Sequence, residues 1–126
     1  MVSAKFITVL AIAATALAAP VEKRSYSGAA TYYNPSAGTN SCGTQASDSD
    51  MMVALNAPQM ANGANPNANP KCGKSMTVKG PKGSVTVTVL DTCPGCSNND
   101  LDLSPAAFDK IADQAQGRVP ITWEWA

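Results

Sequence analysis

The chain contains no histidine, and this absence limits the metal chemistry that it can perform. Of its 126 residues none is His, and four are Cys. Structural zinc sites combine cysteine with histidine or use two CxxC pairs. Here only one CxxC segment is present, Cys93-Pro94-Gly95-Cys96. The sequence therefore predicts no metal site and no cofactor.

Charged residues are also scarce, at 14% of the chain, and the basic ones form no cluster. Residues 25–126 hold eight acidic and six basic side chains. Proteins that bind nucleic acid or anionic membranes need clustered Lys and Arg. We therefore expect no nucleic-acid and no membrane partner, and instead a neutral polysaccharide or another protein. The sequence also lacks an Asn-x-Ser/Thr sequon, so N-glycosylation is not expected.

Long apolar runs are absent except at the amino terminus. A basic residue, Lys5, precedes an apolar run over 6–17, and Ala16-Leu17-Ala18 has the small-x-small form of a cleavage site. The run is shorter than the roughly 20 apolar residues that span a bilayer. Residues 1–18 are therefore predicted to be a secretory signal peptide, so the protein is expected to be secreted to the extracellular space.

Residues 19–24 end in the basic pair Lys23-Arg24. The pair resembles the site of a Kex2-type processing protease, as in many fungal secreted proteins. It is also compatible with a solvated charge pair. We predict that 19–24 is a propeptide and that the mature domain covers 25–126, a length that suits one domain with one core.

The four cysteines of the mature part are expected to form disulfides. An even number of cysteines behind a signal peptide is typical of an oxidising compartment. Four cysteines allow three pairings, and the spacing does not choose among them.

Five segments have the composition of strands. Alternating Val85, Val87 and Val89 predict one core-facing side, and Gly80-Pro81-Lys82-Gly83 predicts a hairpin turn. The apolar segment 51–55 suits either a buried strand or the start of a helix. The five segments are 25–33, 51–55, 75–79, 84–90 and 118–125, and the polar stretches 36–50 and 58–70 are predicted to be loops.

One amphipathic helix is predicted near the carboxyl end. Ser104 and Pro105 suit the N-cap and the first helical position, and apolar residues recur up to Ala115 before Gly117. The pattern as a whole predicts a small, mostly β barrel with a helix on its flank.

Several motifs in order resemble the expansin-like, barwin-like double-psi β-barrel group, which includes bacterial rare lipoprotein A. The strongest are Val89 to Cys96 and Asp100 to Phe108. The others are Gly28–Tyr33, Ser41–Gly43, Val53–Asn56, Asn69–Lys74 and Gly117–Trp123, so that the resemblance covers nearly all of 27–125.

This resemblance implies a six-stranded double-psi β-barrel, stapled by disulfides, with one or two short flanking helices. The chain is similar to the small, single-domain fungal proteins called loosenins, and we expect it to be a monomer. It also implies that Cys42 pairs with Cys72 and that Cys93 pairs with Cys96.

The resemblance points to a groove in which Asp91 and Asp102 lie beside Thr31 and Tyr32. Paired carboxylates can perform glycoside hydrolysis when one is an acid and the other a base. In the related family 45 endoglucanases, the acid matches Asp102, but the position of the base resembles Asn34. Because an amide is not a base at neutral pH, the hydrolytic pair is incomplete and we do not expect an enzyme.

In expansins, the counterpart of Asp102 is thought to grip the glycan without cutting it. Thr31 and Asp91 carry over as well, whereas Cys93 replaces an aromatic residue that some bacterial expansins have there. A lytic transglycosylase of the rare lipoprotein A type would need the histidine that this chain lacks.

Some of these residues also have simpler structural interpretations. Asp91 could satisfy backbone donors of the following turn, and Asp102 or Ser104 could cap the helix. Trp123 and Trp125 share one face and suit a core better than a sugar platform.

The sequence favours two functions of different classes and leaves a true hydrolase, which would release new reducing ends, as a third. The first is a secreted expansin-like protein that binds and loosens cell-wall polysaccharide without hydrolysis. The second is a protein-binding module, such as an inhibitor of papain-like cysteine proteases or a host-directed effector, whose partner would be a secreted protease or a host protein.

Overall fold

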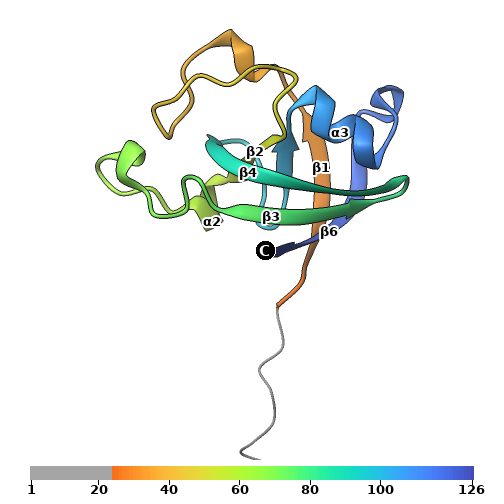
Figure 1. Cartoon of the computed structure of the whole chain (residues 1–126). Coiled ribbons are helices and arrows are strands. Elements are labelled where there is room, and N and C mark those ends of the chain that lie inside the picture. The colour runs from red at the N-terminus through yellow and green to blue at the C-terminus, as the bar shows by residue number, and fades with distance from the viewer. Residues whose placement is uncertain (1–23) are drawn as a thin grey trace, which may run out of the picture.

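The computed structural model describes residues 24–126, which form a closed β-barrel with two short helices (Figure 1). The predicted signal peptide and nearly all of the predicted propeptide, residues 1–23, lie outside the described residues. In the described part of the chain, no helix has the length and apolar character to cross a membrane.

Six strands close the barrel in the order β1-β5-β2-β4-β3-β6. The pairs β1 with β5 and β2 with β4 are parallel, and the other four pairs are antiparallel. The strands are β1 (Tyr26–Tyr32), β2 (Met52–Asn56), β3 (Ser75–Gly80), β4 (Gly83–Cys93), β5 (Leu101–Leu103) and β6 (Val119–Trp125). This architecture confirms the double-psi β-barrel that the motifs predicted.

The five predicted strand segments all correspond to observed strands, and segment 51–55 is a strand rather than a helix. The sixth strand, β5, was not found by pattern because it is only three residues long. In β5, Leu101 and Leu103 are buried while Asp102 between them is partly exposed. A pattern of three residues is too short to indicate a strand on its own.

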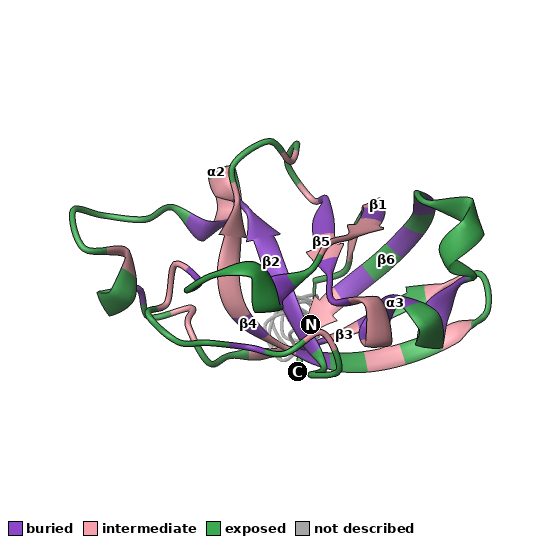
Figure 2. Cartoon of the chain, turned by 90° about the horizontal axis from the view of Figure 1, so that it is seen from above, coloured by how far each residue is buried: buried purple, intermediate pink, exposed green. Residues whose placement is uncertain are grey.

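The barrel interior is filled by alternating side chains from the strands. Figure 2 shows buried residues along β2 and alternating burial along β6. Trp123 is 2% exposed, so it belongs to the core, and Trp125 packs edge-on against it at the rim with ring centroids 5.5 Å apart. Val87 and Val89 line the core as predicted, and Val85 packs at its edge.

Helix α3 (Pro105–Ile111) covers one side of the barrel with Phe108 and Ile111 fully buried. Its N-cap is Ser104, whose hydroxyl accepts a hydrogen bond from the N–H of Ala107 at 3.2 Å. The prediction that the helix continues to Ala115 is wrong. The chain becomes extended at Ala112, and residues Gln114–Gln116 form a separate 3-10 helix.

The polar stretch 58–70 is more ordered than the predicted exposed loop. Its start belongs to helix α2 (Ala57–Met60), which buries Met60, and it contains the 3-10 helix Pro66–Ala68. The side chain of Asn69 is buried, and its amide donates to the carbonyl of Met60 at 2.8 Å. A third 3-10 helix, Pro35–Ala37, lies in the other long loop.

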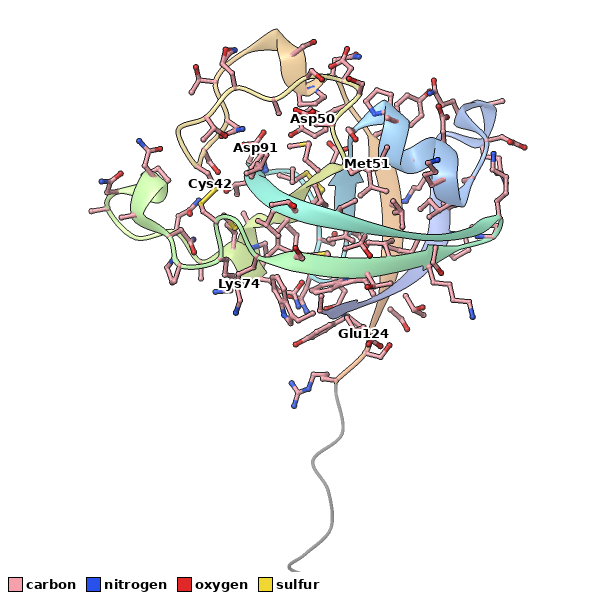
Figure 3. All side chains as sticks on the ribbon, viewed as in Figure 1. Cys42, Asp50, Met51, Lys74, Asp91 and Glu124 are labelled. Carbon is pink, nitrogen blue, oxygen red and sulfur yellow. A yellow bond between two sulfur atoms is a disulfide. The ribbon has the colours of Figure 1, made fainter. Side chains whose placement is uncertain are left out.

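Two disulfides tie the loops to the barrel, with the pairing that the resemblance implied. Cys42 is bonded to Cys72, which joins the two long loops across a sequence separation of 30 residues. Cys93 is bonded to Cys96, which closes a small ring at the end of β4. The bond at Cys42 lies on the side of the molecule where Asp91 is found (Figure 3).

The close contact between β1 and the segment before β5 gives a stability prediction. A Cβ atom at Gly28 would collide with the backbone carbonyl of Asn99, which also accepts the indole N–H of Trp123 at 2.9 Å. We expect Gly28→Ala to destabilise the fold by about 1–3 kcal/mol, the usual cost of overpacking. Urea unfolding measures this change.

Gly38→Ala is the matched control, because Gly38 is in an extended conformation and a Cβ atom added there would meet no other atom within 4 Å. It should change the free energy of unfolding by less than about 0.5 kcal/mol. Equal effects at the two glycines would contradict the close contact.

Candidate functional site

Four strands place one residue each in a row on the side of the barrel wall that faces away from its core, where Ala54 is buried and the other three residues are half-buried. Thr31 pairs with Asp102, Asp102 with Ala54, and Ala54 with Asp91. We call these four residues the Asp102 row. The row therefore joins segments that are 71 residues apart in the sequence, as for Thr31 and Asp102.

Asp91 reaches the row because of a β-bulge. The register between β2 and β4 shifts so that Val53 pairs with Val89 but Ala54 pairs with Asp91, which leaves Leu90 as the extra residue. Without the extra residue, Asp91 would continue the valine face into the core. Bulges redirect side chains in this way and are frequent beside functional sites.

The carboxylate of Asp91 is fully engaged by the protein. Its Oδ1 accepts the N–H of Ser41 at 2.9 Å and the N–H of Thr92 at 2.8 Å, and its Oδ2 accepts the hydroxyl of Tyr33 at 2.8 Å. Asp91 therefore ties the end of β4 to the loop that holds Cys42. The structural role that its sequence position suggested is present.

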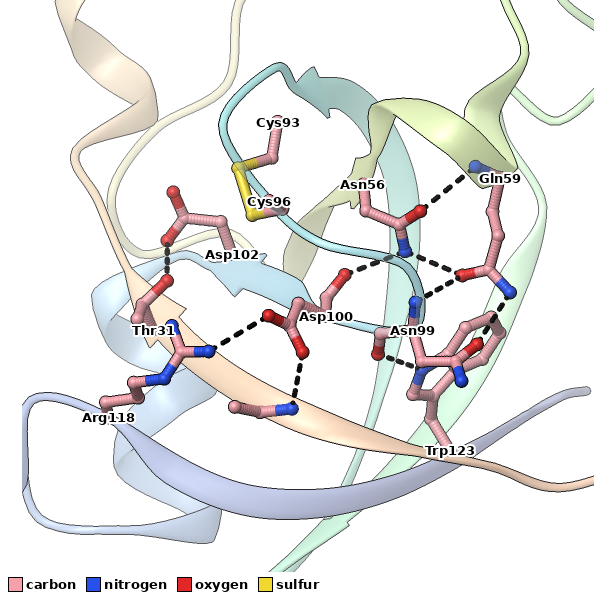
Figure 4. Close-up of polar contacts among 11 residues, drawn as sticks. Thr31, Asn56, Gln59, Cys93, Cys96, Asn99, Asp100, Asp102, Arg118 and Trp123 are labelled. Atoms are coloured by element: carbon pink, nitrogen blue, oxygen red, sulfur yellow. Dashed lines mark hydrogen bonds and ion pairs between the residues drawn. A yellow bond between two sulfur atoms is a disulfide. The ribbon is translucent and has the colours of Figure 1, made fainter.

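Asp102 is far less engaged. Its Oδ1 accepts the hydroxyl of Thr31 at 2.9 Å, which is its one side-chain hydrogen bond to the described residues (Figure 4). The helix cap that was its structural alternative is made by Ser104 instead. Asp102 is thus the carboxylate of the row that has acceptor capacity left for a ligand.

The surroundings of Asp102 disfavour its charge. Partial burial raises the pKa of Asp102, the Thr31 hydroxyl partly offsets this rise, and the nearby charge of Asp91 adds to it. In the described part of the chain, the two ion pairs are Lys82 with Asp113 and Arg118 with Asp100, so neither cation pairs with Asp102. A ligand that donates hydrogen bonds to Asp102 would therefore stabilise its ionised form.

Tyr33 is the aromatic residue that contacts the row, whereas the resemblance pointed to its neighbour Tyr32. Its phenol donates to Asp91, and its pKa is raised by burial and by the charges of Asp91 and Asp102. A raised pKa keeps the phenol protonated, so that it remains a donor. Alternation along β1 was the signal that could have found it, since Thr31 and Tyr33 share a face.

Tyr32, which the resemblance placed in the groove, makes its contacts away from the Asp102 row. Its ring packs on Phe108 with centroids 4.9 Å apart, and its hydroxyl donates to the carbonyl of Gln114 at 3.2 Å. Tyr32 points toward helix α3 because it occupies the strand face of buried Ala30.

Asn34 also lies outside the row. Its amide donates to the carboxylate of Asp48 at 3.0 Å, and Asp48 accepts the N–H of Ser36 as well. The hydrogen bonds from Ser36 and Asn34 lower the pKa of Asp48. Asn34 therefore organises the loop after β1, and the structure does not bring it to Asp102.

The hollows of the described surface offer no alternative pair of carboxylates, since Glu124 is the one acidic residue in their lining. Two surface hollows, of about 510 Å³ and 230 Å³, lie over β3 and β6 and share Lys79 and Thr122 in their lining. Between residues 24 and 126, no three His, Cys, Asp or Glu side chains gather as metal ligands.

The fold and the row define a disulfide-linked double-psi β-barrel whose Asp102 row holds one carboxylate with acceptor capacity for a ligand. Residues 25–123 match the double-psi β-barrel family described as Lytic transglycolase, and the chain belongs to that family.

Two kinds of characterised protein are similar to this chain. It is 40% identical over 102 residues to the papain inhibitor of Streptomyces mobaraensis, covering 78% of this chain and 69% of the inhibitor. The solved structure of a Streptomyces papain inhibitor superposes with a TM-score of 0.76 at 35% identity, covering 85% of this chain and 99% of that one.

The second kind is an expansin. A variant of the Clavibacter michiganensis expansin, solved in complex with cellohexaose, superposes with a TM-score of 0.71 at 30% identity. The match covers 82% of this chain but 50% of that expansin, so this chain spans half of its length.

The different engagement of the two aspartates gives opposite stability predictions. Asp91→Asn loses an acceptor and should destabilise the fold by about 1–3 kcal/mol, because buried donors lose their partner. Asp102→Asn keeps an oxygen for Thr31 and should leave the protein at least as stable as wild type at pH 7. Urea unfolding of both variants measures the difference.

The pH dependence follows from the sign of the Asp102 shift. A carboxyl with a raised pKa in the folded state binds more protons folded than unfolded, so stability falls as pH rises through that pKa. Asp102→Asn removes this loss of stability. The variant should therefore be more stable than wild type at neutral pH, and this difference should vanish below about pH 4, where Asp102 of the unfolded wild type is protonated. Destabilisation by Asp102→Asn as large as by Asp91→Asn would contradict the assignment.

Proposed function

We propose that this protein is a secreted, non-hydrolytic glycan-binding protein of the expansin type, which holds a cell-wall polysaccharide chain on the Asp102 row. The observation that carries the proposal is the open carboxylate of Asp102 beside Thr31. Glycan hydroxyls are donors, and a carboxylate that accepts them makes hydrogen bonds about twice as strong as neutral pairs. The two disulfides support secretion, because such bonds persist in oxidising compartments.

Binding without hydrolysis is supported by the second carboxylate. Inverting hydrolysis needs a base whose oxygen is free to accept a proton from water. The oxygens of Asp91 already accept three hydrogen bonds, and Asn34 is an amide held by Asp48. Asp102 therefore has no free partner base among the residues of the row.

Binding should require Asp102 and should rise with pH. The ionised carboxylate can accept more hydrogen bonds than the one from Thr31, so raising the pH through the elevated pKa of Asp102 should strengthen binding. Asp102→Asn should lower affinity by about tenfold or more, the value of a hydrogen bond to a charged group, and should abolish the pH dependence.

The experiment incubates residues 25–126 with a panel of insoluble cell-wall glycans and measures both pull-down and released reducing sugar. Asp109→Asn, an exposed aspartate on helix α3, is the matched control for the lost charge. Release of reducing sugar that depends on Asp102 would show hydrolysis. Equal glycan binding by Asp102→Asn and Asp109→Asn would show that the Asp102 row is not the binding site.

Inhibition of a papain-like cysteine protease is the second candidate function. It is favoured by the similarity to the papain inhibitor, which extends over nearly the whole of that structure. The two long loops that Cys42 and Cys72 join would provide the contact surface.

This function should depend on the loops and not on the row. Titration of papain activity with the protein should show inhibition that Asp102→Asn retains and that Cys42→Ser/Cys72→Ser weakens. The double variant loses about 3–4 kcal/mol of stability from an opened loop of this length, so its fold must be checked by circular dichroism first. Inhibition lost with Asp102→Asn alone would contradict the loop assignment.

A further inference from the structure

Arg118 extends the Asp102 row by one strand, although the motif Gly117–Trp123 that contains it gave no reason to expect a role in the site. Arg118 directly precedes Val119, which pairs with Ala30 in the antiparallel ladder between β6 and β1. The next pair of that ladder would be Arg118 with Thr31. Because Val119 and Ala30 are both buried, Arg118 and Thr31 share the outer face of the barrel. Figure 4 shows Arg118 beside Thr31, with Asp102 on the other side of Thr31.

The guanidinium of Arg118 is anchored at one corner. Its Nη2 donates to Oδ2 of Asp100 at 3.0 Å, and Oδ1 of Asp100 accepts the N–H of Ala29 at 2.9 Å. The side chain of Asp100 is 12% exposed, while that of Arg118 is 62% exposed. The buried partner therefore holds the orientation of an exposed cation.

Most donors of this guanidinium remain available. Arginine carries five N–H donors, and the contact with Asp100 is the one side-chain hydrogen bond of Arg118 within residues 24–126. Anchoring one nitrogen reduces the entropy that the side chain would lose on binding a ligand. The side chain of Arg118 is thus held in position and still has N–H groups that can donate to a ligand.

Donor and acceptor are complementary along the extended row. Ionised Asp102 can only accept hydrogen bonds, Arg118 can only donate them, and each hydroxyl of a sugar can do both. Arg118 and Asp102 lie two strand spacings apart, about 10 Å, so they would contact different sugar units of one chain.

We propose that Arg118 forms a second glycan subsite, in which its free N–H groups donate to hydroxyl and ring oxygens of a sugar unit beyond the one held by Asp102. This inference rests on the proposed glycan-binding function and specifies where the chain lies. The bound glycan crosses from β5 over β1 to the start of β6.

Affinity for oligosaccharides of increasing length tests the subsite. We would titrate residues 25–126 with soluble cello-oligosaccharides, from the disaccharide to the hexasaccharide, by calorimetry at low ionic strength. Wild type should gain affinity with length. Arg118→Ala should bind the shortest oligomers like wild type but lose the gain on lengthening, by roughly tenfold for a charge-assisted contact.

Lys82→Ala is the matched control, since Lys82 is also an exposed cation paired with an aspartate, Asp113, at 3.1 Å. Lys82→Ala should gain affinity with oligosaccharide length as wild type does. Arg118→Lys retains the charge and the pairing with Asp100 but has fewer donors, so it should show an intermediate gain. If Arg118→Ala does not fold, Arg118→Lys still tests the subsite.

The outcomes separate the two proposals. Asp102→Asn should weaken binding at every length, whereas the variants of Arg118 should change only the longer oligomers. A gain with length that is the same in Arg118→Ala, Arg118→Lys and Lys82→Ala overturns the subsite and leaves the Asp102 site standing. Absence of binding by wild type at every length, together with absence of pull-down by every glycan of the insoluble panel, overturns both.

Discussion

The three hydrogen bonds that Asp91 accepts are the constraint on which the site depends. They join the end of β4, the loop around Ser41 and the residue after β1, Tyr33, through one carboxylate. The bulge at Leu90 is what turns this carboxylate outward. Because Asp91 satisfies these donors, the loop is fixed above the barrel, and the neighbouring Asp102 is left as the carboxylate of the row with acceptor capacity for a ligand.

This division of roles separates a residue that builds the site from one that can use it. Two carboxylates of the same type differ because Asp91 accepts three hydrogen bonds on its two oxygens and Asp102 accepts one, from Thr31. The same logic applies to the cation at the end of the row, since Asp100 anchors Arg118 without consuming its donors. An open row of this kind suits an extended chain better than a small molecule, which is usually enclosed by a concave pocket.

The similarities to a papain inhibitor and to an expansin show that this barrel carries unrelated functions. One fold commonly supports several activities because function resides in particular sites. Here the strands present the Asp102 row, and the loops joined by Cys42 and Cys72 present a neighbouring surface, which Asp91 links to the row through the N–H of Ser41. Glycan binding and protease binding would therefore use different side chains, and Asp102→Asn, which leaves the contacts of Asp91 intact, need not disturb the loop surface.

The sequence by itself determined the strands with alternating valines, the N-cap at Ser104 and the family, because these are local patterns or ordered motifs. It indicated Asp102 through the family motif. Only the tertiary structure showed that Tyr33 rather than Tyr32 faces the site and that β5 exists. It also decided that Asp91 accepts hydrogen bonds from three residues and that Arg118 adjoins Thr31, because a bulge and the pairing of distant strands fix which side chains meet. Neither feature leaves a periodic signal in the sequence.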